Sequence, residues 1–275
     1  MEAGLAKSKQ IMAIFDAYVT KLAEYVGEMR GKGRQVREID CPAAVSKLVE
    51  GLPVRIGPQA SSGIVLRGDT FVELGNPDAG SCAFLLWTDK PSLIRDGKIT
   101  LIGPDVQESP GASLPFGQVL MVGGVGLSEE EHETLEQNQY VADRIEGYMI
   151  RSVSQLMWSR VSKDAAGKGF CFETLGRALM TIFKSEVPKV QAVEIVFVTS
   201  SKEDLQPLDD IGAQVRKIAK DIERETWKAK GFDIVECTLG WDCNSCPDKP
   251  VCDDIRELIT VRKKKASKIE TVTKS

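Results

Sequence analysis

Four cysteines near the C-terminal end of the chain have the residue type and the spacing to bind a metal. They are Cys237, Cys243, Cys246 and Cys252, arranged as C-x5-C-x2-C-x5-C. The central C-x2-C pair presents two thiolates on one tight turn, at about the separation that a tetrahedral iron or zinc centre needs. The outer cysteines can then supply the other two ligands. Pro247, directly after Cys246, stiffens the turn and removes a backbone donor.

The spacing favours a [4Fe–4S] cluster, with two alternatives. Structural zinc usually has two C-x2-C pairs, or cysteine together with histidine, whereas this segment has one pair between two single cysteines. Zinc is therefore the alternative metal. The other alternative is a redox thiol pair, or cysteines without a metal. Cys41, Cys82 and Cys171 lie beside predicted strands or helices, so we expect them to be small packed hydrophobes.

The composition is that of a globular protein. The chain has 275 residues, 42% of them hydrophobic and 28% charged, which is enough for a sizeable core. A net charge of −4 gives no electrostatic footprint for nucleic acid. No segment has the pattern of a membrane span or a signal peptide, so we expect a cytoplasmic protein. The single histidine, His132, argues against a histidine-rich zinc site and a Ser-His-Asp triad, and we expect it to be solvated on a helix.

The helices and strands that must position the cysteines can be predicted from the sequence. Together they indicate an α+β (or mixed α/β) fold, in which a mixed sheet is packed with several helices. Ser128 and Glu131 form a capping-box pattern, which predicts a long helix from there to about residue 159. Apolar spacing predicts other helices over 5–30, after Pro42, over 172–185 and over 200–227. Short apolar runs predict strands over 63–66, 71–74, 83–87, 99–102, 118–122, 193–199 and 232–236, the last leading to the cysteines.

These elements suggest four regions. Residues 1–50 form an N-terminal helical segment and residues 51–230 an α/β domain. Residues 231–262 form the cysteine-rich segment, and residues 263–275 a basic tail that we expect to be solvated rather than bound to nucleic acid.

Several segments in the α/β domain together resemble a known family. They are 71–75 (FVELG), 96–105 (DGKITLIGPD), 113–117 (SLPFG), 146–147 (EG), 158–165 (WSRVSKDA) and 168–170 (KGF). In this order they resemble acetyl-CoA synthase, the beta subunit of the carbon monoxide dehydrogenase/acetyl-CoA synthase complex. The resemblance runs from about residue 54 to 252 and covers the family's middle domain and the start of its metal domain.

The resemblance implies a role for the cysteines. The family's metal domain holds a [4Fe–4S] cluster bridged to two nickel ions, and Cys237 matches its first cluster ligand. The other three correspond loosely, because Gly240 stands where the family has its second cysteine. The family's nickel-binding Cys-Gly-Cys motif is missing from the sequence, so we do not expect complete acetyl-CoA synthase activity from this chain unaided.

The function implied is that of an iron–sulfur electron-transfer or accessory subunit in carbon monoxide, corrinoid or acyl-CoA metabolism, with a metalloenzyme or corrinoid protein as its partner. Two alternatives are the coenzyme A-binding part of an acyl-transfer enzyme that a partner chain completes, and a zinc-stapled interaction module.

The resemblance also implies possible coenzyme A contacts. The family's middle domain is thought to approach coenzyme A with arginines around a tryptophan. Here Trp158, Arg160 and Lys163 lie in the matching segment, with Arg151 shortly before it. Arginine suits a phosphate and tryptophan an adenine face. In the alternative interpretation Trp158 belongs to the core, and Arg160 and Lys163 are a solvated pair at a strand edge.

Overall fold

The computed structural model describes residues 2–57, 65–139, 144–153, 156–229, 249–250 and 253. The chain divides into two units, residues 1–216 and 217–275, and the fold below is that of the first. Two sheets packed with several helices confirm the predicted α+β class. Within the described part of the chain, no helix is both long and apolar enough to cross a membrane.

A five-stranded mixed sheet, in the order β1-β4-β9-β6-β3, forms the centre of the unit. Its strands are β1 (Val36–Asp40), β3 (Ser81–Thr88), β4 (Lys98–Ile102), β6 (Phe116–Gly124) and β9 (Val190–Val198). Of its three inner strands, β6 and β9 run antiparallel to each other and β4 is parallel to β9, while the edge strand β3 is parallel to β6. Every residue of β6 is buried, as is nearly every residue of β9. Burial of this kind along a mostly apolar strand is expected where both faces of a sheet are covered.

A second, four-stranded sheet has the order β5-β2-β8-β7. Its strands are β2 (Thr70–Leu74), β5 (Ser113–Leu114), β7 (Tyr148–Val153) and β8 (Leu156–Ser162). Successive side chains of a strand point to opposite faces. Val72 and Leu74 of β2 are fully buried against the core, whereas Glu73 between them lies on the outer face. The outer face of this sheet therefore carries Glu73 and its register partner on β8, Arg160.

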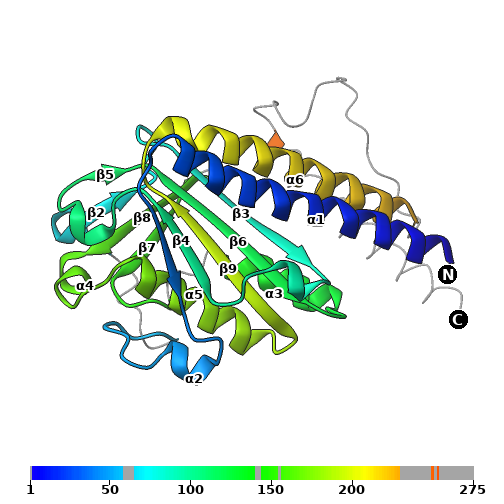
Figure 1. Ribbon diagram of the computed structural model, residues 1–275, viewed down its shortest axis with the longest axis horizontal. Helices are drawn as coiled ribbons and strands as arrows, with labels where there is room; N and C mark the ends of the chain where they lie inside the picture. Colours follow the sequence, from blue (N-terminus) through cyan, green and yellow to red (C-terminus); the bar gives the residue numbers. More distant parts are fainter. Residues whose placement is uncertain are drawn as a thin grey trace, which may run out of the picture. The chain divides into compact units, whose positions relative to one another are not determined.

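Helix α1 (Glu2–Gly31) and residues 202–216 of helix α6 (Lys202–Ala229), the part of α6 in this unit, lie side by side on one face of the five-stranded sheet (Figure 1). The Tyr25 hydroxyl of α1 donates to the Asp204 carbonyl oxygen of α6 at 2.7 Å. Helix α5 (Phe172–Glu186) covers the other face. The remaining short elements are α2 (Val45–Leu48), α3 (Glu129–Asn138), α4 (Lys163–Gly167), and the 3-10 helices η1 (Arg67–Asp69), η2 (Pro91–Leu93) and η3 (Val106–Glu108).

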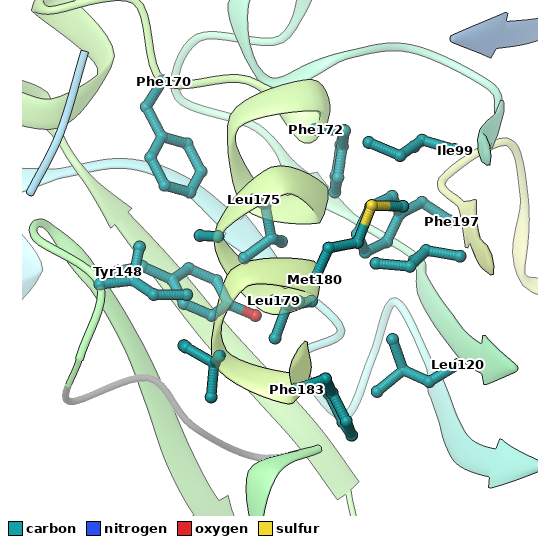
Figure 2. Close-up of a cluster of buried hydrophobic side chains, with 14 of the residues drawn as sticks. Ile99, Leu120, Tyr148, Phe170, Phe172, Leu175, Leu179, Met180, Phe183 and Phe197 are labelled. Carbon is teal, nitrogen blue, oxygen red and sulfur yellow. The ribbon is translucent and has the colours of Figure 1, made fainter. Parts of the chain in front are cut away.

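Helix α5 is packed between the two sheets, and its side chains join their cores. In Figure 2, Phe197 and Ile99 of the five-stranded sheet lie on one side of the helix and Tyr148 of the second sheet lies on the other. The rings of Phe172 and Phe197 are 4.9 Å apart between centroids. Because α5 is buried on nearly all sides, its apolar residues are not confined to a single stripe. This helix fixes the second sheet relative to the first.

The long helix predicted from Ser128 to about residue 159 is wrong beyond its first turns. The capping box forms as expected, with Ser128 Oγ accepting from the Glu131 N–H at 3.2 Å. The helix nevertheless ends at Asn138, and the chain turns into the β7–β8 hairpin. Gly147 has a φ of +71°, and a Cβ there would lie 2.4 Å from the Ala165 Cβ. A continuing helix cannot adopt this conformation.

Other predicted elements have mixed outcomes. The strands predicted over 71–74, 83–87, 99–102, 118–122 and 193–199 are confirmed, as are the helices over 5–30, 172–185 and 200–227. Strand β1 was not predicted. In the strand predicted over 63–66, Val65 and Leu66 belong to no strand, and residues 63–64 lie outside the described residues. The predicted strand over 232–236 also lies outside them.

Candidate functional site

A row of four residues crosses the outer face of the second sheet. Ser113 of β5, Glu73 of β2, Arg160 of β8 and Met149 of β7 are register partners from strand to strand. Arg160 Nε and Nη2 both lie 2.8 Å from Glu73 Oε1. Asn76 Nδ2 and Ser113 Oγ each lie 3.5 Å from the other carboxylate oxygen. Glu73 is therefore the centre of a polar cluster.

Arg160 is held in place by this cluster. Its side chain is only 9% exposed, and that of Glu73 is 19% exposed. The guanidinium carbon lies 5.6 Å from the centroid of the Trp158 ring, within the range of a cation–π contact. In the register of the hairpin, Arg151 is the partner of Trp158. The strand register thus places Arg151 and Trp158 in one cross-strand row of this face and Arg160 in the next row.

Lys163 lies apart from this row. It is the first residue of α4, and its ammonium group donates to the Gly68 carbonyl oxygen at 2.8 Å. The alternative interpretation of a solvated strand-edge pair is wrong for Arg160, which is buried. Lys163 is exposed, as that interpretation expects, but it belongs to α4 and not to a strand edge. The coenzyme A contacts of Trp158, Arg160, Lys163 and Arg151 stay a prediction.

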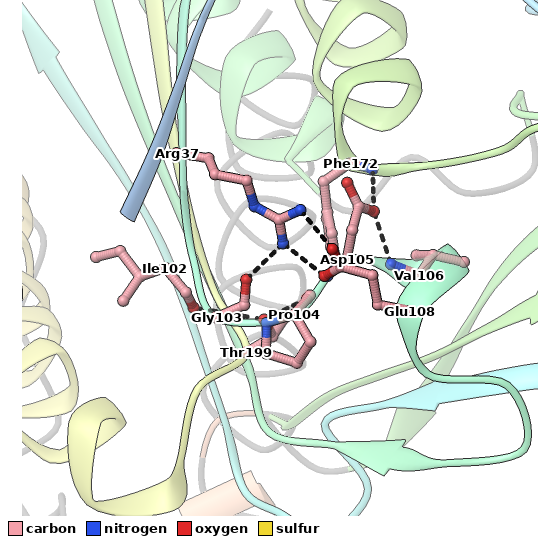
Figure 3. A network of polar contacts seen from close by, with 9 residues as sticks. All are labelled: Arg37, Ile102, Gly103, Pro104, Asp105, Val106, Glu108, Phe172 and Thr199. Carbon is pink, nitrogen blue, oxygen red and sulfur yellow. Dashed lines mark hydrogen bonds and ion pairs between the residues drawn. The ribbon is translucent and has the colours of Figure 1, made fainter. Parts of the chain in front are cut away.

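A polar network at the start of α5 anchors the helix (Figure 3). Asp105 Oδ1 accepts from the next backbone N–H at 2.6 Å and from the Phe172 N–H at 3.0 Å. Glu108 closes a capping box on the Asp105 N–H at 2.7 Å. Arg37 of β1 donates to Glu108 and to the Gly103 carbonyl oxygen. Sequence reasoning missed this network, although the order Asp-Val-Gln-Glu is a capping-box signal.

Two of the described cysteines, Cys82 and Cys41, are not activated thiols. Burial raises the pKa of Cys82 to about 12 and that of Cys41 to about 11. Cys82 is a packed hydrophobe, as predicted, and the half-buried Cys41 also packs against the core. Cys171 is half-buried, with its Sγ 3.5 Å from Thr174 Oγ1. His132 is also half-buried and packs edge-on against Trp87, with ring centroids 4.3 Å apart, rather than being fully solvated.

The predicted metal ligands Cys237, Cys243, Cys246 and Cys252 lie outside the described residues. In the part of the chain that the structure does describe, no group of three or more His, Cys, Asp or Glu residues could hold a metal ion. The predicted cysteine site therefore stays a prediction.

Comparison with known proteins identifies the family to which the chain belongs. Residues 52–204 match the family described as the CO dehydrogenase/acetyl-CoA synthase complex beta subunit. The chain belongs to this family, which confirms the resemblance found in its sequence. The matched residues run from before β2 to the start of α6, so they include Glu73, Trp158, Arg160 and Lys163.

Individual relatives agree with this assignment. The chain is 29% identical over 203 residues to acetyl-CoA decarbonylase/synthase complex subunit beta 1 of Methanosarcina thermophila, covering 73% of this chain and 42% of the relative. It is 30% identical over 207 residues to the acetyl-CoA decarbonylase/synthase complex subunit beta of Methanopyrus kandleri, covering 73% of this chain and 43% of the relative. It is 33% identical over 160 residues to carbon monoxide dehydrogenase/acetyl-CoA synthase subunit alpha of Moorella thermoacetica, covering 56% and 22%. The chain thus spans less than half the length of these relatives.

Proposed function

We propose that this chain is a cytoplasmic iron–sulfur protein that acts as an electron-transfer or accessory subunit in one-carbon or acyl-CoA metabolism. The observation that carries the proposal is the spacing of Cys237, Cys243, Cys246 and Cys252, in a chain whose relatives are named as subunits of an acetyl-CoA decarbonylase/synthase complex. A metalloenzyme or a corrinoid protein is the partner proposed. Complete acetyl-CoA synthase activity is not proposed for this chain alone.

The chemistry of the other cysteines supports this choice of ligands. A cysteine binds metal as the thiolate. Cys82 and Cys41, with pKa values of about 12 and about 11, stay protonated near neutral pH and are poor ligands. The proposed ligands are instead the four clustered cysteines, whose four thiolates would match the four corners of a cubane cluster.

Metal analysis of protein purified without oxygen tests the proposal. We expect about four irons per chain. The Cys243→Ser variant should lose most of the iron, because it removes one of the two thiolates of the central turn. Cys171→Ser is the matched control, since Cys171 is half-buried on the folded unit, and it should keep its iron. About one zinc per chain without iron would instead support the zinc-stapled module.

Coenzyme A binding is the second candidate, and the contact between Trp158 and Arg160 favours it. An aromatic face beside a fixed guanidinium suits a base next to a phosphate. Trp158→Ala should weaken coenzyme A binding by about tenfold in calorimetry, because one stacked base contributes about 1–3 kcal/mol. Lys168→Met, which changes a lysine already bonded to Glu146 and Asp164, should bind as the wild type does. Equal affinities in all three proteins would refute the site.

A further inference from the structure

A pocket of about 490 Å³ opens beside the outer row, between the start of β2, the segment before β5 and helix α4. Its volume lies within the range of small-molecule sites. Phe71, Pro110 and Ala166 supply apolar wall, and Lys163 and Gln107 supply polar groups. Trp158 and Arg160 do not line the pocket, whereas Lys163, which is also a predicted coenzyme A contact, does.

The polar groups of the pocket are held in place. Gln107 Nε2 donates to the carbonyl oxygens of Ala166 at 2.9 Å and Phe170 at 2.8 Å, which uses both hydrogens of the amide. Its Oε1 is the atom left to accept. Lys163 Nζ carries three hydrogens, and its bond to the Gly68 carbonyl oxygen uses one of them. The pocket thus offers a positioned ammonium group and a fixed amide oxygen.

The charge of the pocket suits a monoanion. Lys163 supplies one positive charge, and the backbone N–H of Gly111, which also lines the pocket, already donates to the Phe71 carbonyl oxygen at 2.6 Å. Phosphate sites typically gather several backbone N–H groups as well as a cation. We propose that this pocket binds a small carboxylate with a short apolar body, the carboxylate at Lys163 and the body against Phe71 and Pro110. The proposal goes beyond the iron–sulfur function and does not depend on it.

A series of ligands tests the proposal by calorimetry. Acetate, butyrate and hexanoate should bind with affinities that rise about fourfold per buried methylene group until the pocket is filled. Hexanamide, which keeps the body but loses the charge, should bind about fivefold more weakly than hexanoate. Inorganic phosphate should bind no better than acetate. Tighter binding of phosphate than of hexanoate would overturn the ligand class.

Two variants locate the binding. A Cβ at Gly167 would meet no atom within 4 Å, so Gly167→Leu should fold normally by circular dichroism, fill part of the pocket and abolish hexanoate binding. Lys163→Met should weaken hexanoate by about fivefold and leave hexanamide unchanged. Lys168→Met is the matched control, because its ammonium group already lies 2.7 Å from Glu146 and from Asp164. Wild-type affinity in Gly167→Leu, or no saturable binding to the native chain, would overturn the proposal.

Discussion

The ion pair between Glu73 and Arg160 gives a quantitative test of how the outer face is built. In Arg160→Met, the carboxylate of Glu73 keeps only the two long contacts to Asn76 and Ser113, each 3.5 Å. Breaking a buried pair by removing one partner costs about 3–5 kcal/mol. Because Glu73 is still 19% exposed, we expect the lower end, about 3 kcal/mol of unfolding free energy.

A double-mutant cycle isolates the free energy of interaction between Glu73 and Arg160 from their other contacts. Glu73→Gln with Arg160→Met removes both charges and should cost about 1 kcal/mol, less than Arg160→Met alone. The assay is urea unfolding followed by circular dichroism, and Arg160→Met should also lower Tm by about 6–12 °C. Arg216→Met is the control, because Arg216 and Asp209 are both about half exposed, and it should change stability by less than about 0.5 kcal/mol. An Arg160→Met protein as stable as Arg216→Met would refute the reasoning.

Three other perturbations follow from the described contacts. Asp105→Ala removes an acceptor from two backbone N–H groups and should cost about 1–2 kcal/mol in urea unfolding; an unchanged midpoint would contradict the anchoring role of the network in Figure 3. Burial raises the pKa of Cys82 to about 12, so iodoacetamide at about pH 8 should label the half-buried Cys171 well before Cys82. Mass spectrometry of the native protein measures the order of labelling, and labelling of Cys82 first would contradict its burial. Burial also raises the pKa of Tyr148 above its ordinary value. The stability that comes from keeping this phenol neutral is complete below about pH 10 and is lost as the pH rises further. The free energy of unfolding of Tyr148→Phe should therefore fall less than that of the wild type between about pH 9 and pH 11.

Sequence patterns predict elements well where burial alone decides them. Strands β6 and β9 are apolar at almost every position, and α5 is a compact apolar helix. Strand β1 was missed because Arg37, Glu38 and Asp40 suit an edge strand, which has no continuous apolar run. The β7–β8 hairpin was taken for helix because Ile145 and Met149 fit a helical spacing as well as a strand. Tertiary packing settled the choice.

The candidate site was partly predictable. Trp158 and Arg160 are two residues apart, so a strand puts both on the same face. The partner of Arg160 was not predictable, because Glu73 is 87 residues away in the sequence and meets it only through the register of β2 and β8. The pocket at Lys163 likewise depends on how α4 packs beside β2, which no local pattern specifies.

The most direct test of the iron–sulfur assignment is a reduction cycle on protein purified without oxygen, with iron measured on the same sample. If Cys237, Cys243, Cys246 and Cys252 hold a cluster, the protein should absorb broadly near about 400 nm, bleach on reduction and recover on reoxidation, in proportion to about four irons per chain. A colourless protein that contains about one zinc per chain and shows no change on reduction would contradict the assignment.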